Sequence, residues 1–248
     1  MRIMSTRPVT TSPQDRLLQV LATVAQSSGA LSAAELGAMT GLPKSSLYRQ
    51  LARLRHWGFV QEVDGGYAPG PMGLQLAQGF DATSHLVQEA REDMHKLVRQ
   101  SGESVGLIVA VNDRAICIEM LESPQALRCS FEKGRSVALR RGATAKCLLA
   151  HLPQARRRAV LDAADDEPHP RDATWEELEV IRQAGYARSQ SEIDEGVWGA
   201  SAPIFGGGQH LLGCLTLMAP VARALPREAE LTQMVIVAAA RISRNLNL

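Results

Sequence analysis

The chain has 248 residues, of which 45% are hydrophobic, and its formal net charge is +1. That length suits one or two globular domains, and because no apolar run approaches the roughly 20 residues of a membrane span and no apolar leader precedes a cleavage site, we expect a cytoplasmic protein. The cysteines Cys117, Cys129, Cys147 and Cys214 lie far apart without a CxxC pair, which argues against a disulfide framework and a zinc site.

The N-terminal stretch predicts a mobile start followed by a helix. Residues 1–12 are polar and contain proline, a composition typical of a mobile terminus. From Pro13 onward, Leu17, Leu18, Leu21 and Val24 recur on one face of a helix that Ser12 can cap. This helix is expected to contribute to a small helical core.

The segment from Leu31 to Tyr67 predicts two helices joined by a tight turn. Ser32 is followed three residues later by Glu35, the spacing of a capping box. Gly41 allows the turn, and Pro43 suits the opening of the second helix. On that helix Leu47, Leu51 and Leu54 form an apolar stripe that must face inward.

The opposite face of the second helix is short-chained, hydrogen-bonding and basic. It comprises Ser45, Tyr48, Arg49, Ala52, Arg53 and His56, with Lys44 and Ser46 nearby at the amino end of the helix. Small residues permit close approach to a DNA major groove, while Arg and Tyr reach base edges or phosphates. We expect Tyr48 and Arg49 to contact bases, and Lys44, Ser45, Ser46 and Arg53 to contact mainly phosphates. The alternative is a surface helix whose charges are merely solvated.

Two further features favour the DNA-binding interpretation. Residues 59–63 alternate like a strand, and Asp64-Gly65-Gly66 predicts the turn of a hairpin that forms a wing. Residues 1–78 carry a net charge of +3 and the remainder −2. Attraction to nucleic acid is therefore expected in the N-terminal part.

The rest of the chain predicts an α+β fold. Pro69 and Pro71 precede a short apolar helix, and an amphipathic helix over Ala82–Arg99 leads into a second domain or pairs with a partner subunit. The expected strands, with an Asn112-Asp113 turn between the first two, are Ser104–Val111, Arg114–Leu121, Ala126–Phe131, Tyr186–Gln190, Val197–Phe205 and His210–Met218. The expected helices, with a polar loop at 165–174, are Thr144–His151, Pro153–Ala164, Trp175–Gln183 and Arg227–Leu246.

Over almost its whole length the chain resembles the IclR family of bacterial transcription regulators. The N-terminal resemblance rests on DRLLQVL, LSAAELGAMTGLPKSSLYRQLARLRHWGFV and YAPGPMGLQLA. The C-terminal resemblance rests on GESVGLIV, RGATAKCLLAHL, IRQAGYARSQSEIDEGVWGASAPIF and GCLTLMAP. It implies a winged helix–turn–helix DNA-binding domain over 1–70, linker helices over 71–99, and a GAF-like effector-binding domain over 100–248, an antiparallel sheet flanked by helices.

The resemblance also implies partners and a ligand pocket. Proteins similar to this one bind double-stranded operator DNA as homodimers that associate into tetramers, and they bind a small organic or aromatic acid as effector. Carried over by position, the effector pocket consists of Ala143, Thr144, Ser189, Gly199, Thr216 and Met218. The resemblance implies no cofactor, metal or membrane partner. The sequence does not specify the effector, the operator or whether the protein represses or activates transcription.

Departures from the family pattern bear on the effector. Ala145 stands before Lys146 where the family usually has Gly, Gly199 replaces a cysteine frequent in related pockets, and Met218 leaves Thr216 as the only hydroxyl of the last strand. Fewer hydrogen-bonding groups and a flexible thioether favour a larger or more apolar ligand than a two-carbon acid. Independently, Thr144 can cap a helix beginning near Ala145, where free amides form a site for a carboxylate.

Three other interpretations compete. Gly102-Glu103-Ser104-Val105-Gly106 matches the GxSxG nucleophile elbow of hydrolases, with the N-terminal domain then a partner-binding module, although here a helix precedes the motif and a strand follows it. Potential metal ligands, more simply explained as core residues, are Cys147, His151, His210 and Cys214. The third interpretation is a ligand-free architectural DNA binder.

Overall fold

A computed structural model describes residues 12–27, 29–163 and 169–247, which form two compact units divided between Thr83 and Ser84. The division falls inside the predicted linker. The predictions of a mobile 1–11, of a helix reaching Ala164 and of the first part of the loop 165–174 lie outside the described residues. Among those described, no helix is long and apolar enough to cross a bilayer.

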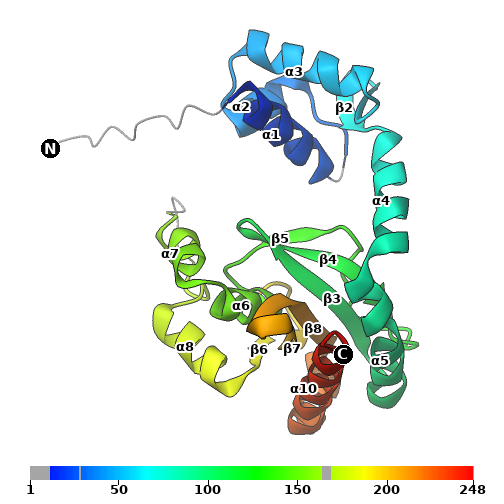
Figure 1. The fold of residues 1–248 in the computed structure, drawn as a ribbon, viewed down its shortest axis with the longest axis vertical. Helices are drawn as coiled ribbons and strands as arrows, with labels where there is room; N and C mark the ends of the chain where they lie inside the picture. The colour runs from blue at the N-terminus through cyan, green and yellow to red at the C-terminus, as the bar shows by residue number, and fades with distance from the viewer. Residues whose placement is uncertain (1–11, 28, 164–168, 248) are drawn as a thin grey trace, which may run out of the picture. The chain divides into compact units, whose positions relative to one another are not determined.

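The first unit is a winged helix–turn–helix followed by a helix. Its elements are α1 (Pro13–Ala25), α2 (Ala33–Thr40), α3 (Lys44–His56), β1 (Val60–Val63), β2 (Gly66–Pro69) and α4 (Met72–Thr83). The predicted capping box of Ser32 and Glu35 is present, and a second one joins Ser12 to Asp15. Asp64 and Gly65 have positive φ, so the β1–β2 hairpin closes through the kind of two-residue turn that its sequence predicted. The strand pair β1–β2 lies beside α3 (Figure 1).

The second unit is built on one six-stranded antiparallel sheet. Its strands are β3 (Ser104–Val111), β4 (Arg114–Leu121), β5 (Ser136–Ala138), β6 (Ala187–Gln190), β7 (Val197–Gly206) and β8 (His210–Pro220), in the spatial order β5-β4-β3-β8-β7-β6. Its helices are α5 (His85–Ser101), α6 (Gly142–His151), α7 (Gln154–Asp162), α8 (Trp175–Ala184), α9 (Val221–Ala224) and α10 (Glu228–Asn245), with 3-10 turns at Gly207–Gln209 and Leu225–Arg227.

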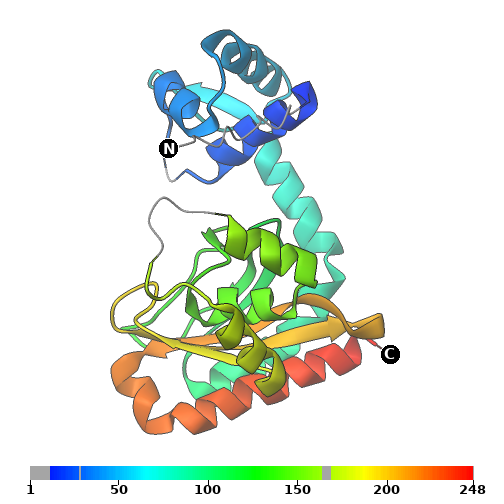
Figure 2. The ribbon, with the colours of Figure 1, turned by 90° about the vertical axis from the view of Figure 1, so that its left-hand side faces the viewer.

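Each face of the sheet carries its own core. Helices α5 and α10 cover one face, around Met94, Trp198, Leu217 and Val235. Helices α6, α7 and α8 cover the other, around Leu148 and the residues near it. Figures 1 and 2 show this three-layer arrangement from two directions, with α10 and α6 on opposite faces of the strands. The expected α+β fold with an antiparallel sheet flanked by helices is confirmed.

Several predicted boundaries are wrong. No strand forms at Ala126–Phe131, which runs as a loop. The third strand of this region is instead β5, which pairs with β4 after a turn at Gly134, where φ is +86°. The predicted helix from Ala82 begins at His85, because Ser84 caps it and separates it from α4. The short helix α9 was not predicted.

Candidate DNA interface and effector cavity

The inward face of α3 positions this helix. Leu47, Leu51 and Leu54 are almost fully buried in the core of the first unit. Gly41, with φ of +65°, ends α2 and makes the turn into α3. The backbone of Leu31 pairs with that of Tyr67 through N–H···O bonds of 2.9 and 2.7 Å, which attaches the wing to the start of the helix–turn–helix. The predicted apolar stripe is therefore confirmed.

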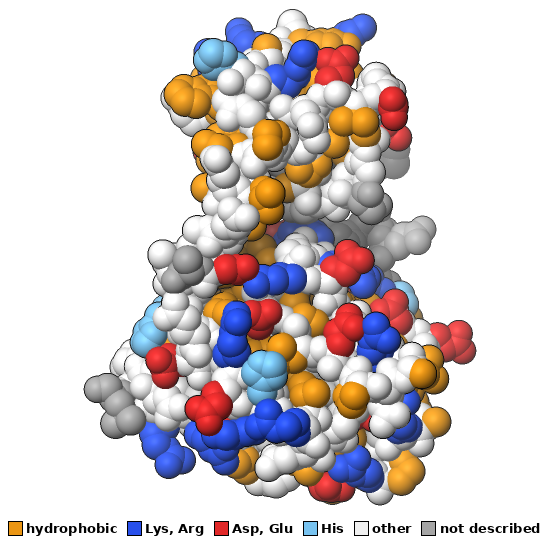
Figure 3. Space-filling view, turned by 90° about the vertical axis from the view of Figure 1, so that its right-hand side faces the viewer, with side chains coloured by type: hydrophobic (Ala, Val, Ile, Leu, Met, Phe, Trp, Pro, Cys, Tyr) orange, Lys and Arg blue, Asp and Glu red, His pale blue; other side chains and the backbone are white. Residues whose placement is uncertain are grey.

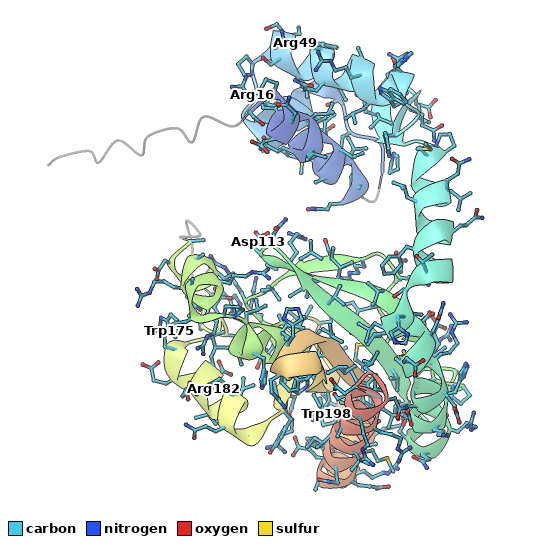
Figure 4. All side chains as sticks on the ribbon, in the orientation of Figure 1. Arg16, Arg49, Asp113, Trp175, Arg182 and Trp198 are labelled. Carbon is cyan, nitrogen blue, oxygen red and sulfur yellow. The ribbon has the colours of Figure 1, made fainter. Side chains whose placement is uncertain are left out.

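The outward face of α3 exposes five of the six predicted DNA-binding residues, namely Lys44, Ser45, Tyr48, Arg49 and Arg53. The expectation that Ser46 belongs to this face is wrong, because its side chain is buried. Residues of a helix recur about every 3.6 positions, so Ser46 shares its side with Gln50, which is also buried. Figure 4 shows Arg49 on the side of α3 turned away from α1.

The charges on this face are available to a ligand. Within the described residues, no carboxylate forms an ion pair with Lys44, Arg49 or Arg53. Arg55 differs, since it pairs with Glu62 on β1 at 2.8 Å and links α3 to the wing. On the face of the second unit that Figure 3 shows, by contrast, acidic and basic side chains alternate. The uncompensated positive charge of α3 thus suits a phosphate backbone.

The six predicted pocket residues line one cavity of the second unit. This cavity, called the effector cavity below, has a volume of 510 Å³ and is lined by Ala143, Thr144, Ser189, Gly199, Thr216 and Met218, among others. They come from the start of α6 and from three neighbouring strands. The structure therefore brings together residues that the sequence separates widely, and their role as effector contacts remains a prediction.

The amino end of α6 forms the polar end of this cavity, but not in the predicted way. The helix begins at Gly142, so Thr144 lies within its first turn and caps nothing. The Gly142 amide donates to Glu192 Oε2 at 2.9 Å, and the Ala143 amide donates to Ser189 Oγ at 2.9 Å. The expected helix start near Ala145 with Thr144 as its cap is therefore wrong, and the amides of the actual start at Gly142 and Ala143 are paired with a carboxylate and a hydroxyl of the protein itself.

Lys146 connects this helix start to two carboxylates. Its Nζ lies 2.8 Å from Glu177 Oε1 and 2.9 Å from Glu192 Oε2, and its side chain is only 4% exposed. Burial disfavours the charged ammonium, but the hydrogen bonds that it donates to the two carboxylates, together with their negative charges, outweigh this and raise the pKa of Lys146. The lysine therefore stays charged and holds Glu192 against α6.

Two lining hydroxyls, those of Thr144 and Thr216, form the floor of the effector cavity, and the fully buried Ser201 hydroxyl lies behind them. Thr216 Oγ1 lies 2.9 Å from Thr144 Oγ1 and 2.8 Å from Ser201 Oγ. Ser201 was missed from the sequence, although it follows Gly199 by two positions and so faces the same side of β7. A Cβ atom at Gly199 would meet only ordinary contacts, 3.6 Å from Ser189 Oγ and 3.7 Å from Ala143 Cβ. The glycine thus leaves ligand space beside a polar floor.

The remaining lining combines apolar side chains with charged ones, namely Arg128, Arg141, Glu192, Asp194 and Glu195. The apolar side chains include Phe131, Val137, Val197, Met218 and Pro220, and Ile193 lies at the amino end of α6. An apolar wall opposite a few fixed polar groups is the usual composition of a small-molecule site. The cavity is accordingly large enough for a small organic molecule that has both apolar and polar parts.

The structure does not assemble the alternative sites. Ser104 is fully buried at the start of β3, and its Oγ accepts a hydrogen bond from the Ser123 amide at 3.0 Å, so Ser104 is not presented as an exposed nucleophile. His151 Nδ1 lies 2.8 Å from the carbonyl oxygen of Cys147. Across the part of the chain that the structure describes, no three His, Cys, Asp or Glu side chains gather as a metal site.

A winged helix–turn–helix followed by a sheet domain with a ligand-sized cavity is the architecture of a transcription regulator. Family models agree: the model for the IclR helix–turn–helix domain matches residues 15–64, and that for the C-terminal domain of the bacterial transcriptional regulator IclR matches residues 82–244. The chain belongs to the IclR family of bacterial transcriptional regulators.

Curated relatives are regulators as well. An HTH-type transcriptional regulator of Mycobacterium tuberculosis is 30% identical over 223 residues, which is 87% of this chain and 85% of the relative. KipR of Bacillus subtilis is 28% identical, covering 87% of this chain and 90% of its own. The transcriptional repressor IclR of Escherichia coli is 25% identical, covering 96% and 92%. These relatives leave the hydrolase interpretation without support.

Solved structures share the fold. An IclR-type regulator from a Silicibacter species superposes with a TM-score of 0.83 at 22% identity, covering 95% of this chain and 96% of that one. An IclR homologue from Microbacterium hydrocarbonoxydans, complexed with 4-hydroxybenzoate, has a TM-score of 0.71 at 22% identity and covers 95% and 99%.

The ion network at the start of α6 yields a stability prediction. We expect Lys146→Met to lower the free energy of unfolding by about 2–4 kcal/mol, because it leaves the Glu192 carboxylate buried without its cation. Lys146→Met combined with Glu192→Gln should recover part of this loss, since the amide still accepts from Gly142. Urea denaturation followed by circular dichroism measures both.

The control is Lys96→Met, which removes a cation paired with Glu92 on the surface of α5. Its effect should stay below about 0.5 kcal/mol. Equal losses for Lys146→Met and Lys96→Met would contradict the role assigned to the buried network.

Proposed function

We propose that this regulator binds operator DNA sequence-specifically through α3, acts as a homo-oligomer, and responds to a small organic or aromatic acid bound in the effector cavity. The observation that carries the DNA-binding part is the exposed basic face of α3, whose cations lack partners among the described carboxylates. The effector part rests on a cavity with a polar end, a hydroxyl floor and partly apolar walls.

The exposed residues of α3 are proposed to contact different parts of the DNA, according to their position on the helix. Tyr48 and Arg49 lie mid-face and are proposed to read base edges, while Lys44, Ser45 and Arg53 are proposed to contact phosphates. Ser46 is no longer included, because a buried hydroxyl cannot reach DNA without repacking the helix. A recognition helix requires basic side chains on a face where small residues allow the helix to approach the DNA closely.

Helix α4 supports a homodimer. Its side chains Leu74, Leu76 and Phe80 are 65%, 59% and 45% exposed. Several apolar side chains exposed on one helix mark an interaction surface rather than a solvent face. A two-fold dimer would present two recognition helices to half-sites about 34 Å apart or a multiple of that. A tetramer on DNA, implied by the family resemblance, is a further association of such dimers.

The effector class follows from the cavity walls. An acid's carboxylate would lie near Ser189 at the start of α6, where it would compete with the hydrogen bonds that Glu192 and Ser189 already accept from the helix amides. Its hydrocarbon would lie on Met218 and Phe131. The related structure that holds 4-hydroxybenzoate supports an aromatic acid. A ligand of this kind can shift DNA binding only by its differential affinity for the two states of the regulator.

The DNA-binding proposal predicts different losses for different residues. In fluorescence anisotropy with the DNA that flanks its own gene, Arg49→Ala should weaken selective binding about tenfold or more by removing a base contact. Lys44→Ala should weaken binding to all sequences and reduce the salt slope by about 0.9.

Arg99→Ala, an exposed cation on α5, is the control and should bind like the wild type. If Arg49→Ala retained full affinity and selectivity, the assignment of α3 as the recognition helix would fail.

The dimer proposal predicts a change of mass. Leu76→Lys combined with Phe80→Lys should convert the protein to a monomer in sedimentation equilibrium, because charges would enter an apolar contact. Gln75→Lys, a new cation at an exposed position of the same helix, should leave the oligomer intact. Dissociation by both changes, or by neither, would count against a contact through this surface.

The effector proposal predicts selective loss of ligand binding. Acids that bind only the native state raise its melting temperature, and we expect 4-hydroxybenzoate or a related aromatic acid to do so. Gly199→Phe should abolish the shift by filling the cavity, and Thr216→Val should reduce it. Gln190→Ala, at an exposed position of β6, should leave it unchanged. If no organic or aromatic acid raised the melting temperature, the result would instead favour the interpretation as a ligand-free architectural DNA binder.

A further inference from the structure

A second cavity, called the hairpin cavity below, lies at the other end of α6. It has a volume of 1110 Å³ and is formed where the β7–β8 hairpin meets the end of α6, the start of α7, the end of α8 and α10. It shares no lining residue with the effector cavity, which lies at the beginning of α6. A ligand at one cavity would therefore leave the other open.

The charge of the hairpin cavity has one sign. Its lining contains Arg156, Arg157 and Arg182 but, among the described residues, neither Asp nor Glu. His151 and His210 also line it, and burial lowers the pKa of the His151 imidazole, so the three arginines are the permanent charges of the lining. Cations that converge on one cavity without a lining carboxylate attract anions.

The three arginines differ in how many of their hydrogen-bond donors already have a partner in the protein. Arg182 is bound through two nitrogens to Glu179, outside the lining, at 3.1 and 2.7 Å. Arg156 uses one nitrogen on the Asn112 carbonyl at 2.6 Å. Arg157 comes only within 3.9 Å of Glu179, and its buried Nε has no hydrogen-bond partner. Arg156 and Arg157 thus keep donors for a ligand.

An unpaired buried donor is costly, so the state of Arg157 calls for an acceptor. Its guanidinium lies 5.6 Å from the ring of Trp175, and Figure 4 shows Trp175 and Arg182 together on α8. Stacking of this kind holds the planar group in one orientation. A guanidinium fixed in this way presents a fork that fits a carboxylate or sulfonate.

The rest of the lining combines apolar side chains with neutral polar ones such as Gln154, Gln209 and Ser243, and the cavity does not suit an extended peptide. Phe205, Leu211 and Ile236 line it. Strand β6 pairs with β7 only as far as Ser201, but the free edge beyond cannot accept another strand. Pro203 has no N–H, and the Phe205 amide already donates to Ser243 Oγ at 3.0 Å. The occupant is therefore a small molecule rather than an added strand.

We propose that the hairpin cavity is a second ligand site, which takes a small organic anion with a hydrocarbon body. Arg156 and Arg157 hold its carboxylate or sulfonate, and the apolar walls of β7, β8 and α10 hold its hydrocarbon. This site is independent of the effector cavity and of the proposed DNA-binding residues.

The test titrates the full-length protein with 1-anilinonaphthalene-8-sulfonate, an anion of this shape whose fluorescence rises in apolar surroundings. We expect saturable binding that Arg156→Gln with Arg157→Gln weakens about tenfold or more. Arg158→Gln, the next residue on α7 and exposed outside the cavity, should bind like the wild type. Circular dichroism melts establish that each variant is folded.

Two further variants separate the cavities. Ala240→Trp, at an exposed position of α10 that lines the hairpin cavity, should remove the binding by filling the space, and it decides the matter if the arginine variants fail to fold. Gly199→Phe, which fills the effector cavity, should leave it in place. The proposal is overturned if the wild type shows no saturable binding, if the arginine pair or Ala240→Trp changes nothing, or if Gly199→Phe removes all binding.

Discussion

The Glu192 carboxylate at the start of α6 is the contact on which the second unit depends most. Nine of the ten residues of α6 are buried, so its first amides and its lysine need partners inside the protein. Glu192 serves both, since it accepts from the Gly142 amide and pairs with Lys146. Gly142 itself has φ of +84° and no room for a Cβ atom, which would lie 2.9 Å from Ile193. Both the backbone conformation and the packing at this position therefore favour glycine as the first residue of α6.

A buried helix held in this way organises both cavities. Helix α6 packs against β6, β7, β8 and α8, and its beginning and end each face a cavity. The polar groups at the beginning are already paired, whereas Arg157 beyond the end retains an unpaired buried donor. A ligand of the first cavity would therefore have to compete with internal hydrogen bonds, whereas the second cavity offers a donor that the protein itself leaves unpaired.

Much of the fold follows from local patterns. The apolar stripe of α3, the capping box of Ser32 and the strands Ser104–Val111 and Arg114–Leu121 were all legible, because each depends on neighbours within a few residues. The strand predicted at Ala126–Phe131 does not form, because strand pairing depends on residues that are distant in the sequence. Its composition suits a strand, but the edge position beside β4 is occupied by Ser136–Ala138, so tertiary pairing overrides local propensity.

The sites show the same division more sharply. The face of α3 was readable from periodicity except at Ser46, where a polar residue at the edge of the stripe turns inward with Gln50. The resemblance grouped six residues that line one cavity, and their role as effector contacts stays a prediction. A local capping rule pointed to Thr144, whereas the fold satisfies the helix start with a carboxylate 50 residues away. A solvent-exposed helix end must find its cap nearby or in water, but a buried one takes whatever polar group the fold brings to it, and no short-range pattern records which group that is.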